Sequence, residues 1–326
     1  MPRTRKPRAG SMQYWPRKRA RREYPRVRAW AKKNEVKLLG FAGYKVGMTH
    51  ILHIDNRKNS ITKGLEISCP VTLIECPPLK IISARFYKKS PYGLKVEKEV
   101  YGQIDKEIGR KICLPKKQSA ADLSKINPEE YDDITVVVST QPKLTGIGKK
   151  KPEIFEVGIG GNIKQKFEYA KSTIGKEVKV NDIFKEGQLV DIHAVTKGKG
   201  YQGPVKRFGV SIRQHKSEKT KRGPGSLGAW CAQGHMMYRV AHAGQMGYQT
   251  RTEYNKWLLK IFGENEISKI NPKSGFHKYG VVKNSCLMIK GSIPGPIKRM
   301  IRINSSIRDN KRIPKEQPVI TYINIH

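Results

Sequence analysis

The 326-residue chain carries 65 Lys plus Arg against 27 Asp plus Glu, a formal net charge of +38. A compact globule this basic repels itself, and a nucleic-acid backbone is the polyanion that neutralises such a charge while releasing counterions. No stretch reaches the roughly 18 apolar residues of a membrane-spanning helix, and the basic segments lack an apolar face, so RNA or DNA is favoured over a membrane.

Residues 1–37 are predicted to form a basic arm that binds RNA. They hold fourteen Lys or Arg against Glu23 and Glu35, and no apolar core of a secretory signal follows the first charges. Aromatic side chains among cations stack on bases or pack against sugars while the charges meet phosphates. A solvated, disordered tail is the alternative, but such tails seldom carry bulky aromatics. The aromatic residues in question are Tyr14, Trp15, Tyr24 and Trp30.

Residues 38–79 have the texture of β-strands and are predicted to be the first part of a β-barrel. The runs LLGFAGYKVGMTHILHI and VTLIECPPL are rich in Val, Ile, Leu and Phe and are bounded by turn residues. The pair Pro77-Pro78 is expected to end the second run. A third run, KIISARFYKK, begins at Lys80.

Residues 80–180 are predicted to form an inserted α/β domain, because the charge per residue falls there. SAADLSKI at 119–126 and the following NPEEYDDI carry helix signals, and DITVVVST is a candidate buried strand. GIGG at 158–161 lacks the Lys-Ser or Lys-Thr of a phosphate-binding loop, so it is interpreted as a hairpin or strand-end turn.

Residues 181–210 and 276–326 are expected to return to the barrel. A short capped helix is predicted from Asn181 to a stop at Gly187, followed by the strand QLVDIHAVT and the start of a basic loop. VVKNSCLMIKGSIPGPIKRMIRI and QPVITYINI supply closing strands. The fold class is therefore mainly β, a barrel whose first and last parts meet while an α+β insertion projects from it.

The stretch from Thr196 to Lys256 is the most unusual in the chain. It has ten glycines and twelve Lys or Arg, and its only acids are Glu218 and Glu253. It cannot bury enough apolar area to offset an ordering cost of roughly 1 to 2 kcal/mol per residue. We predict a central finger over residues 211–275, disordered alone and ordered inside RNA, with Trp230 near its tip as a stacking wedge. The alternative is that Trp230 is a core aromatic beside MMYRV.

Enzymatic and metal-binding readings find weaker support. Five scattered cysteines without a CxxC pair indicate a reducing compartment, and Cys231 with His235 lacks the second ligand pair of a zinc site. Ser211 or Cys231 with His215 or His235 could form a nucleophile and base by residue type. An RNA-processing enzyme, a non-ribosomal RNA-binding protein and a DNA packager are the alternatives kept open.

Several long blocks together resemble one known family. They are GSMQYWPRKRA at 10–20, GFAGYKVGMTHI at 40–51, VTKGKGYQGPVKRFGV at 195–210, GSLGAW at 225–230, AGQMGYQTRTEYNK at 243–256 and IKGSIPGP at 289–296. These blocks resemble the signatures of the universal large-subunit ribosomal protein three family in its archaeal type. They follow the family order and span most of the chain.

The resemblance implies a six-stranded β-barrel of the translation-protein type, an inserted α/β domain, and basic N-terminal and central extensions. It implies a structural constituent of the large ribosomal subunit that binds 23S-type rRNA, supports subunit assembly and is not an enzyme. It also implies a cytoplasmic location, large-subunit rRNA and neighbouring large-subunit proteins as partners, no membrane and no homo-oligomer. No cofactor is implied, any Mg²⁺ being bound by the RNA rather than by the protein.

The resemblance further implies where RNA is bound. The finger tip, expected near the peptidyl-transferase centre, comprises Gly228, Ala229, Trp230 and Cys231; many relatives follow that tryptophan with His-Pro, and this chain has Cys231-Ala232. The expected rRNA-binding residues of the arm are Arg5, Arg8, Trp15, Arg17, Lys18, Arg19, Arg21 and Arg22. Those of the central segment are Lys197, Lys199, Gln202, Lys206, Arg207, Arg213, His215, Lys216, Lys221, Arg222, Trp230, His235, Arg239, Gln245, Gln249 and Arg251.

Overall fold

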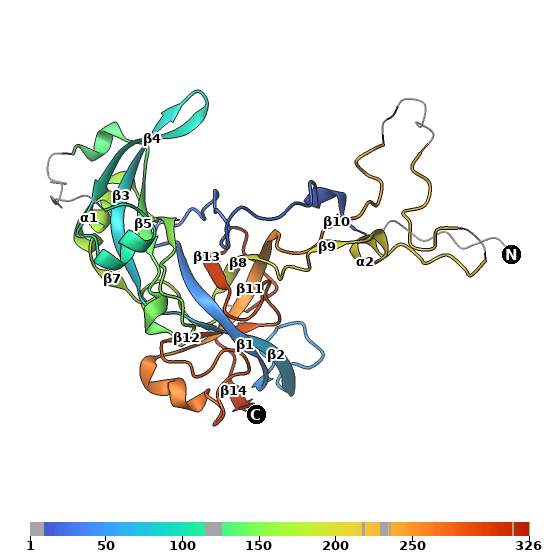
Figure 1. Cartoon of the computed structure of the whole chain (residues 1–326). Coiled ribbons are helices and arrows are strands. Elements are labelled where there is room, and N and C mark those ends of the chain that lie inside the picture. Colours follow the sequence, from blue (N-terminus) through green and yellow to red (C-terminus); the bar gives the residue numbers. More distant parts are fainter. Residues whose placement is uncertain are drawn as a thin grey trace. The chain divides into compact units, whose positions relative to one another are not determined.

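The computed structural model describes residues 10–114, 126–216, 219–228, 234, 236–314 and 316–325. The chain divides into two compact units. Figure 1 is coloured along the sequence, so its bar locates the segments of each unit. Unit 1 comprises Met1–Arg22 and Val195–Thr250, and unit 2 comprises Glu23–Ala194 and Arg251–His326. Most of the helix predicted over 119–126 lies outside the described residues.

A closed ring of six strands forms the centre of the larger sheet. Its order is β13-β8-β11-β12-β2-β1-β14, and β13 also pairs with β1, so all but β14 complete a circle. The first and last parts of the sequence meet there, with Tyr44 opposite Met300, as the sequence predicts. The strands are β1 (Gly40–Ile54), β2 (Glu66–Glu75), β8 (Leu189–Val195), β11 (Thr250–Phe262), β12 (Cys286–Lys290), β13 (Met300–Ser305) and β14 (Ile320–Ile323).

The strands of the ring contribute to one shared buried core. All six residues of β13 are buried, as are the first four of β12. Leu73, Leu258 and Ile301 are fully buried within one continuous core cluster. Strand β11 lies in the ring, so residues 251–262, which the sequence analysis assigns to the finger, belong to unit 2.

The segment between β2 and β8 builds a second, antiparallel sheet in order β4-β3-β5-β6, with β7 on β3. Its strands are β3 (Leu79–Ser90), β4 (Gly93–Tyr101), β5 (Asp133–Ser139), β6 (Ile154–Gly158) and β7 (Glu177–Val178). Helix α1 (Ile163–Thr173) follows β6 and packs against β5 (Figure 1). GIGG is a strand-end turn, as predicted, because Gly158 ends β6 and Asn162 caps α1.

Short helices complete the described chain. The helix predicted from Asn181 is instead one 3₁₀ turn, although Gly187 adopts the positive φ of +77° expected of a stop. The 3₁₀ turns are η1 (Met12–Tyr14), η2 (Lys106–Arg110), η4 (Pro128–Glu130), η5 (Pro142–Leu144), η6 (Val180–Asp182) and η8 (Glu264–Lys269). The remaining elements are β9 (Tyr201–Gln202), α2 (Pro204–Phe208) and β10 (Gly244–Gln245).

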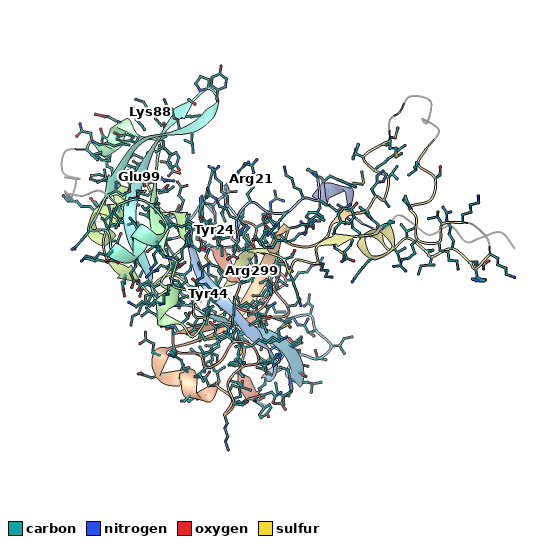
Figure 2. All side chains as sticks on the ribbon, in the orientation of Figure 1. Arg21, Tyr24, Tyr44, Lys88, Glu99 and Arg299 are labelled. Carbon is teal, nitrogen blue, oxygen red and sulfur yellow. The ribbon has the colours of Figure 1, made fainter. Side chains whose placement is uncertain are left out.

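Residues 23–37, predicted to be part of the basic arm, are built into unit 2. The Tyr24 hydroxyl donates to the Ile154 carbonyl at 2.9 Å, and the Gly161 amide donates to the Lys33 carbonyl at 2.8 Å. Figure 2 labels Tyr24 and also Tyr44 of β1, whose hydroxyl bonds to Thr140 at 3.2 Å. Both tyrosines thus tie their own segments to the inserted sheet.

Arg302 of β13 is the buried charge that holds this segment. Only 2% of the residue is exposed, and its guanidinium lies over the rings of Trp30 and Phe155 at 5.6 and 4.5 Å. It donates to the Pro25 carbonyl at 3.3 Å and to the Glu156 carbonyl at 2.6 Å. Burial lowers the pKa of Arg302 to about 9, so the group remains protonated at neutral pH.

We therefore expect Arg302→Met to lower the free energy of unfolding by about 2 to 4 kcal/mol, because two buried carbonyls lose their donor. The measurement is urea unfolding of the full chain followed by circular dichroism. Arg308→Met, at an exposed position, is the control and should change stability by less than about 0.5 kcal/mol. Equal stability of the two variants would contradict the role given to Arg302.

Candidate nucleic-acid interface

Unit 1 is almost devoid of acidic residues. Its two sequence segments contain nine Lys or Arg in residues 1–22 and ten in residues 195–250, against Glu218 alone. Charge pairing therefore cannot hold these segments together, and their contacts must come from the backbone, aromatic rings and glycine turns. The excess charge is left for a polyanion.

A short helix between two tight turns gives unit 1 its local scaffold. Pro204 occupies the first turn of α2, where its missing N–H costs nothing, and Gly209 ends the helix at φ +67°. The strand before the helix, β9, pairs antiparallel with β10, placing Gln202 opposite Gly244. The pattern Gly-Pro followed five residues later by Gly signals this helix, which the sequence analysis left as loop.

Arg207, at the C-terminal end of α2, is held by three main-chain carbonyls and lies over the Phe208 ring at 5.1 Å. Its guanidinium donates to the carbonyls of Gln245, His242 and Arg17 at 3.1, 2.9 and 3.2 Å. One side chain thus joins the helix, the returning strand and the N-terminal arm. The residue was predicted to bind rRNA, and the structure gives it a positioning role within the protein.

Two glycine-rich loops cross beside this arginine. The amides of Lys199 and Tyr248 donate to the carbonyls of Met246 and Lys197 at 2.9 and 3.3 Å. Gly247 lies at the crossing with φ +68°, and a Cβ there would sit 2.1 Å from the Lys197 carbonyl oxygen. Only glycine permits this approach, and the approach fixes the backbone on which Lys197 and Lys199 are mounted.

The N-terminal arm packs on the same scaffold through ring contacts. Trp15 stacks on Phe208 with ring centroids 5.9 Å apart, and the Arg17 guanidinium lies 4.6 Å from the centre of the Phe208 ring. Arg19 lies over Tyr248 at 4.9 Å, and the Ala20 amide donates to the Tyr248 carbonyl. Trp15 was predicted to bind rRNA, and one of its faces is already occupied by protein.

These contacts leave a polar pocket of about 300 Å³ in unit 1. Four cations and no carboxylate lie in its wall, and the Gln245 side-chain amide donates to the Met246 and Gly247 carbonyls, which stiffens the rim. Such a concave, carboxylate-free cluster of cations fits a phosphate group. The lining residues are Arg17, Thr196, Lys197, Lys199, Arg207, Gln245, Met246, Gly247 and Gln249.

Around this pocket the structure brings Arg17 of the arm together with five of the predicted rRNA-binding residues of the central segment. These five are Lys197, Lys199, Arg207, Gln245 and Gln249. Arg251 belongs to β11 of unit 2. Those exposed elsewhere in unit 1 are Lys18, Arg19, Arg21, Arg22, Lys206, His215, Lys216, Lys221, Arg222, Arg239 and the tip residue Gly228, with Gln202 and Arg213 half-buried. Arg5, Arg8, Ala229, Trp230, Cys231 and His235 lie outside the described residues.

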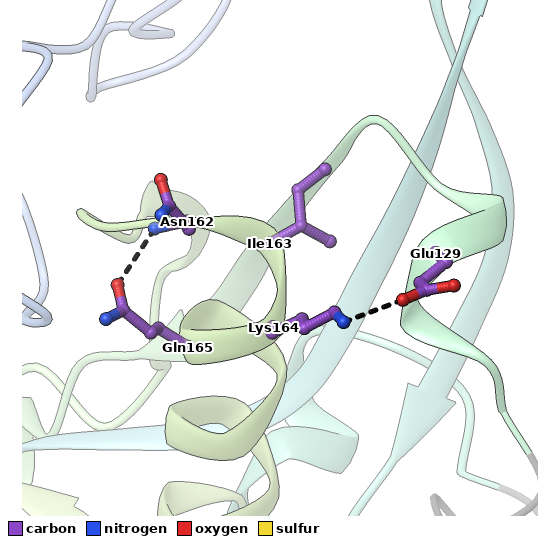
Figure 3. A pocket seen from close by; sticks show the side chains of 5 residues that line it. All are labelled: Glu129, Asn162, Ile163, Lys164 and Gln165. Carbon is purple, nitrogen blue, oxygen red and sulfur yellow. Dashed lines mark hydrogen bonds and ion pairs between the residues drawn. The ribbon is translucent and has the colours of Figure 1, made fainter.

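Other kinds of site find little support in the described part of the chain. A shallow pocket at the start of α1 is lined by residues already paired with one another: Lys164 with Glu129 at 2.7 Å, and the Asn162 amide with Gln165 (Figure 3). Ser211 and His215 are exposed and make no hydrogen bond with each other. Within the described ranges no cluster of three potential metal ligands occurs, and no helix there could cross a membrane.

Comparison with known proteins indicates the class of this chain: it is similar to proteins of the large ribosomal subunit. The chain is 48% identical to a protein of Methanobrevibacter smithii over 99% of this chain and 98% of that protein, and 47% identical to one of Archaeoglobus fulgidus over 94% and 93%. A Methanopyrus kandleri protein is 43% identical over 98% and 90%. Each is called large ribosomal subunit protein uL3.

The family model for ribosomal protein L3 matches residues 1–325. The chain therefore belongs to the ribosomal protein L3 family, whose members are structural components of the ribosome and not enzymes. The family predicted from the sequence blocks is confirmed.

The loop crossing gives a direct prediction. We expect Gly247→Ala to separate the two loops, because its methyl group would collide with the Lys197 carbonyl. Amide hydrogen exchange at Lys199 and Tyr248, followed by NMR or mass spectrometry, should become at least about tenfold faster, which corresponds to roughly 1.4 kcal/mol of local stability. Gly203→Ala is the matched control, since nothing lies within 4 Å of a Cβ there. Unchanged exchange in Gly247→Ala would contradict the crossing.

Proposed function

We propose that this chain is a cytoplasmic structural constituent of the large ribosomal subunit that binds large-subunit rRNA through unit 1. The observation that carries the proposal is the pocket in which Arg17, Lys197 and Lys199 meet with no carboxylate in the wall. Membership of the ribosomal protein L3 family supports ribosomal RNA as the polyanion.

Unit 1 achieves binding by presenting cations on a braced backbone. Arg207 and the crossing at Gly247 hold the two glycine-rich loops, so Lys197 and Lys199 do not have to be ordered by RNA from a fully flexible state. Preorganisation of this kind lowers the entropic cost of association. Phosphates that enter the pocket release their counterions, which supplies the favourable free energy.

The central segment extends this role to assembly. Cations on the arm and on both glycine-rich loops neutralise repulsion between RNA segments and so fix their relative positions. The finger tip, Gly228 to Cys231, is proposed to reach toward the peptidyl-transferase centre, where RNA performs the chemistry. We further propose that the protein holds no metal of its own, that Mg²⁺ is bound by the RNA, that neighbouring large-subunit proteins are its protein partners, and that it does not form a homo-oligomer.

The dependence of affinity on salt tests the pocket. With about ten phosphates neutralised, the affinity of the full chain for large-subunit rRNA should fall by roughly 10³ to 10⁵ between 50 and 200 mM salt. Lys197→Ala with Lys199→Ala should make the logarithmic slope shallower by about 1.4 to 1.8, because two phosphate contacts are lost. Filter binding over a salt series measures both quantities.

The matched control removes the same charge elsewhere. Lys58 and Lys63 are exposed residues of unit 2 for which the described chain shows no ion pair. Lys58→Ala with Lys63→Ala should leave the slope near that of the unaltered chain. A flat titration of the unaltered chain would refute rRNA binding, and identical slopes in the two double variants would refute the pocket.

A further inference from the structure

Strands β3 and β4 continue beyond the inserted sheet as a free two-stranded hairpin. Strand β5 pairs with β3 only as far as Tyr87, opposite Asp133, whereas β3 and β4 remain paired out to Ser90 opposite Gly93. Figure 2 shows Lys88 toward the outer end of the hairpin and Glu99 nearer the sheet. A hairpin that leaves its sheet has no face on which to bury side chains, and such hairpins are marginal in water.

The turn of this hairpin exposes a complete aromatic side chain. Pro91 fixes φ at the first position of the two-residue turn, and Gly93, which directly follows the turn, adopts φ +117°. The local sequence therefore determines the conformation of the turn. Tyr92 stands between them with a relative exposure of 101%. Leu94 and Val96 follow on β4 at 56% and 41%. An aromatic ring presented this fully is a stacking surface.

The charges on the hairpin repel one another. Lys88 and Lys95 lie directly opposite across the two strands, which places their Cβ atoms about 4.5 to 5.5 Å apart. Lys89 and Lys98 are also exposed, and Glu97 is the one acid within residues 88–98, 3.9 Å from Lys88. Among the described residues no carboxylate pairs with Lys95 or Lys98. Opposed like charges destabilise an antiparallel pair, so the arrangement favours an anion between them.

Protection of a sheet edge does not account for this pattern. Lysines on an edge strand prevent pairing with other chains, and β4 is an edge strand. Beyond Tyr87 β3 is an edge as well, because β5 no longer pairs with it, so lysines on either strand could serve that role. Edge protection does not require two lysines directly opposite each other, as Lys88 and Lys95 are, or an exposed ring in the turn.

We propose that the hairpin over residues 88–98 is a second RNA-binding element, located in unit 2, in which the lysines contact phosphates and Tyr92 stacks on an unpaired base. Four lysines against one glutamate match a phosphate backbone, and a ring beside cations matches single-stranded or irregular RNA. The element rests on the proposed RNA-binding function and adds to it a surface separate from the pocket of unit 1.

The test uses the full chain and large-subunit rRNA in filter binding. Tyr92→Leu should bind the rRNA at least about fivefold more weakly than Tyr92→Phe, because only the phenylalanine variant keeps the ring. Tyr92→Phe should match the unaltered chain. Lys88→Ala with Lys95→Ala should make the salt slope shallower by about 1.4 to 1.8, whereas Lys58→Ala with Lys63→Ala should not. All substituted side chains are exposed, and circular dichroism confirms that each variant is folded.

Equal affinities of Tyr92→Leu and Tyr92→Phe, together with an unchanged slope in the lysine variant, would overturn the proposal. Amide protection of residues 88–98 in large subunits that persists after nuclease digestion would assign the hairpin to a protein partner and would also overturn it. A steep titration of the unaltered chain in either case leaves the proposed function standing, so the two failures are distinguishable.

Discussion

The hydrogen bonds from Arg207 to three main-chain carbonyls are the interaction on which unit 1 depends. A carboxylate partner would neutralise the arginine, whereas carbonyl dipoles satisfy its donors and leave its charge in place. Unit 1 can therefore brace two loops and an arm while keeping almost all of its positive charge. Arg302 follows the same rule in unit 2, where the Pro25 and Glu156 carbonyls receive its donors. In unit 1, Arg207 thus contributes both packing and positive charge, whereas Arg302 is buried and contributes packing alone.

Strand positions could be predicted from the sequence because burial in this fold is continuous. β5 buries nearly every residue, so its Ile and Val run stands out without any alternation. β13 is also buried throughout, but there Ile301 and Ile303 alternate with Arg302 and Asn304. The two α-helices were missed for a different reason. Helix α1 fully buries only Ala170, although Ile163 and Phe167 pack against the core beside it with the i, i+4, i+7 spacing of a helix face, and α2 is only five residues long. Further signals are at the helix ends, in the cap Asn162 and in Pro204 and Gly209.

The residue types of the candidate site could be predicted from the sequence, but the contacts that each residue makes could not. Charge and glycine content set residues 196–256 apart from the rest of the sequence, but they treat all cations alike. Arg207 and Lys199 look equivalent in the sequence, and only the fold shows that one braces backbone while the other is exposed. Trp30 likewise has the sequence context of an arm aromatic, but it lies against Gly158 and under Arg302 because residues 23–37 are part of unit 2. Long-range contacts of this kind leave no local pattern.

We propose that RNA phosphate, more than any protein neighbour, retains this chain in the large subunit. Sedimentation of purified large subunits through a salt series, with and without prior nuclease digestion, measures this most directly. We expect the protein to travel with the subunit at moderate salt, to be released at high salt, and to be lost after digestion even at moderate salt. Retention with other proteins once the RNA has been removed would contradict the claim.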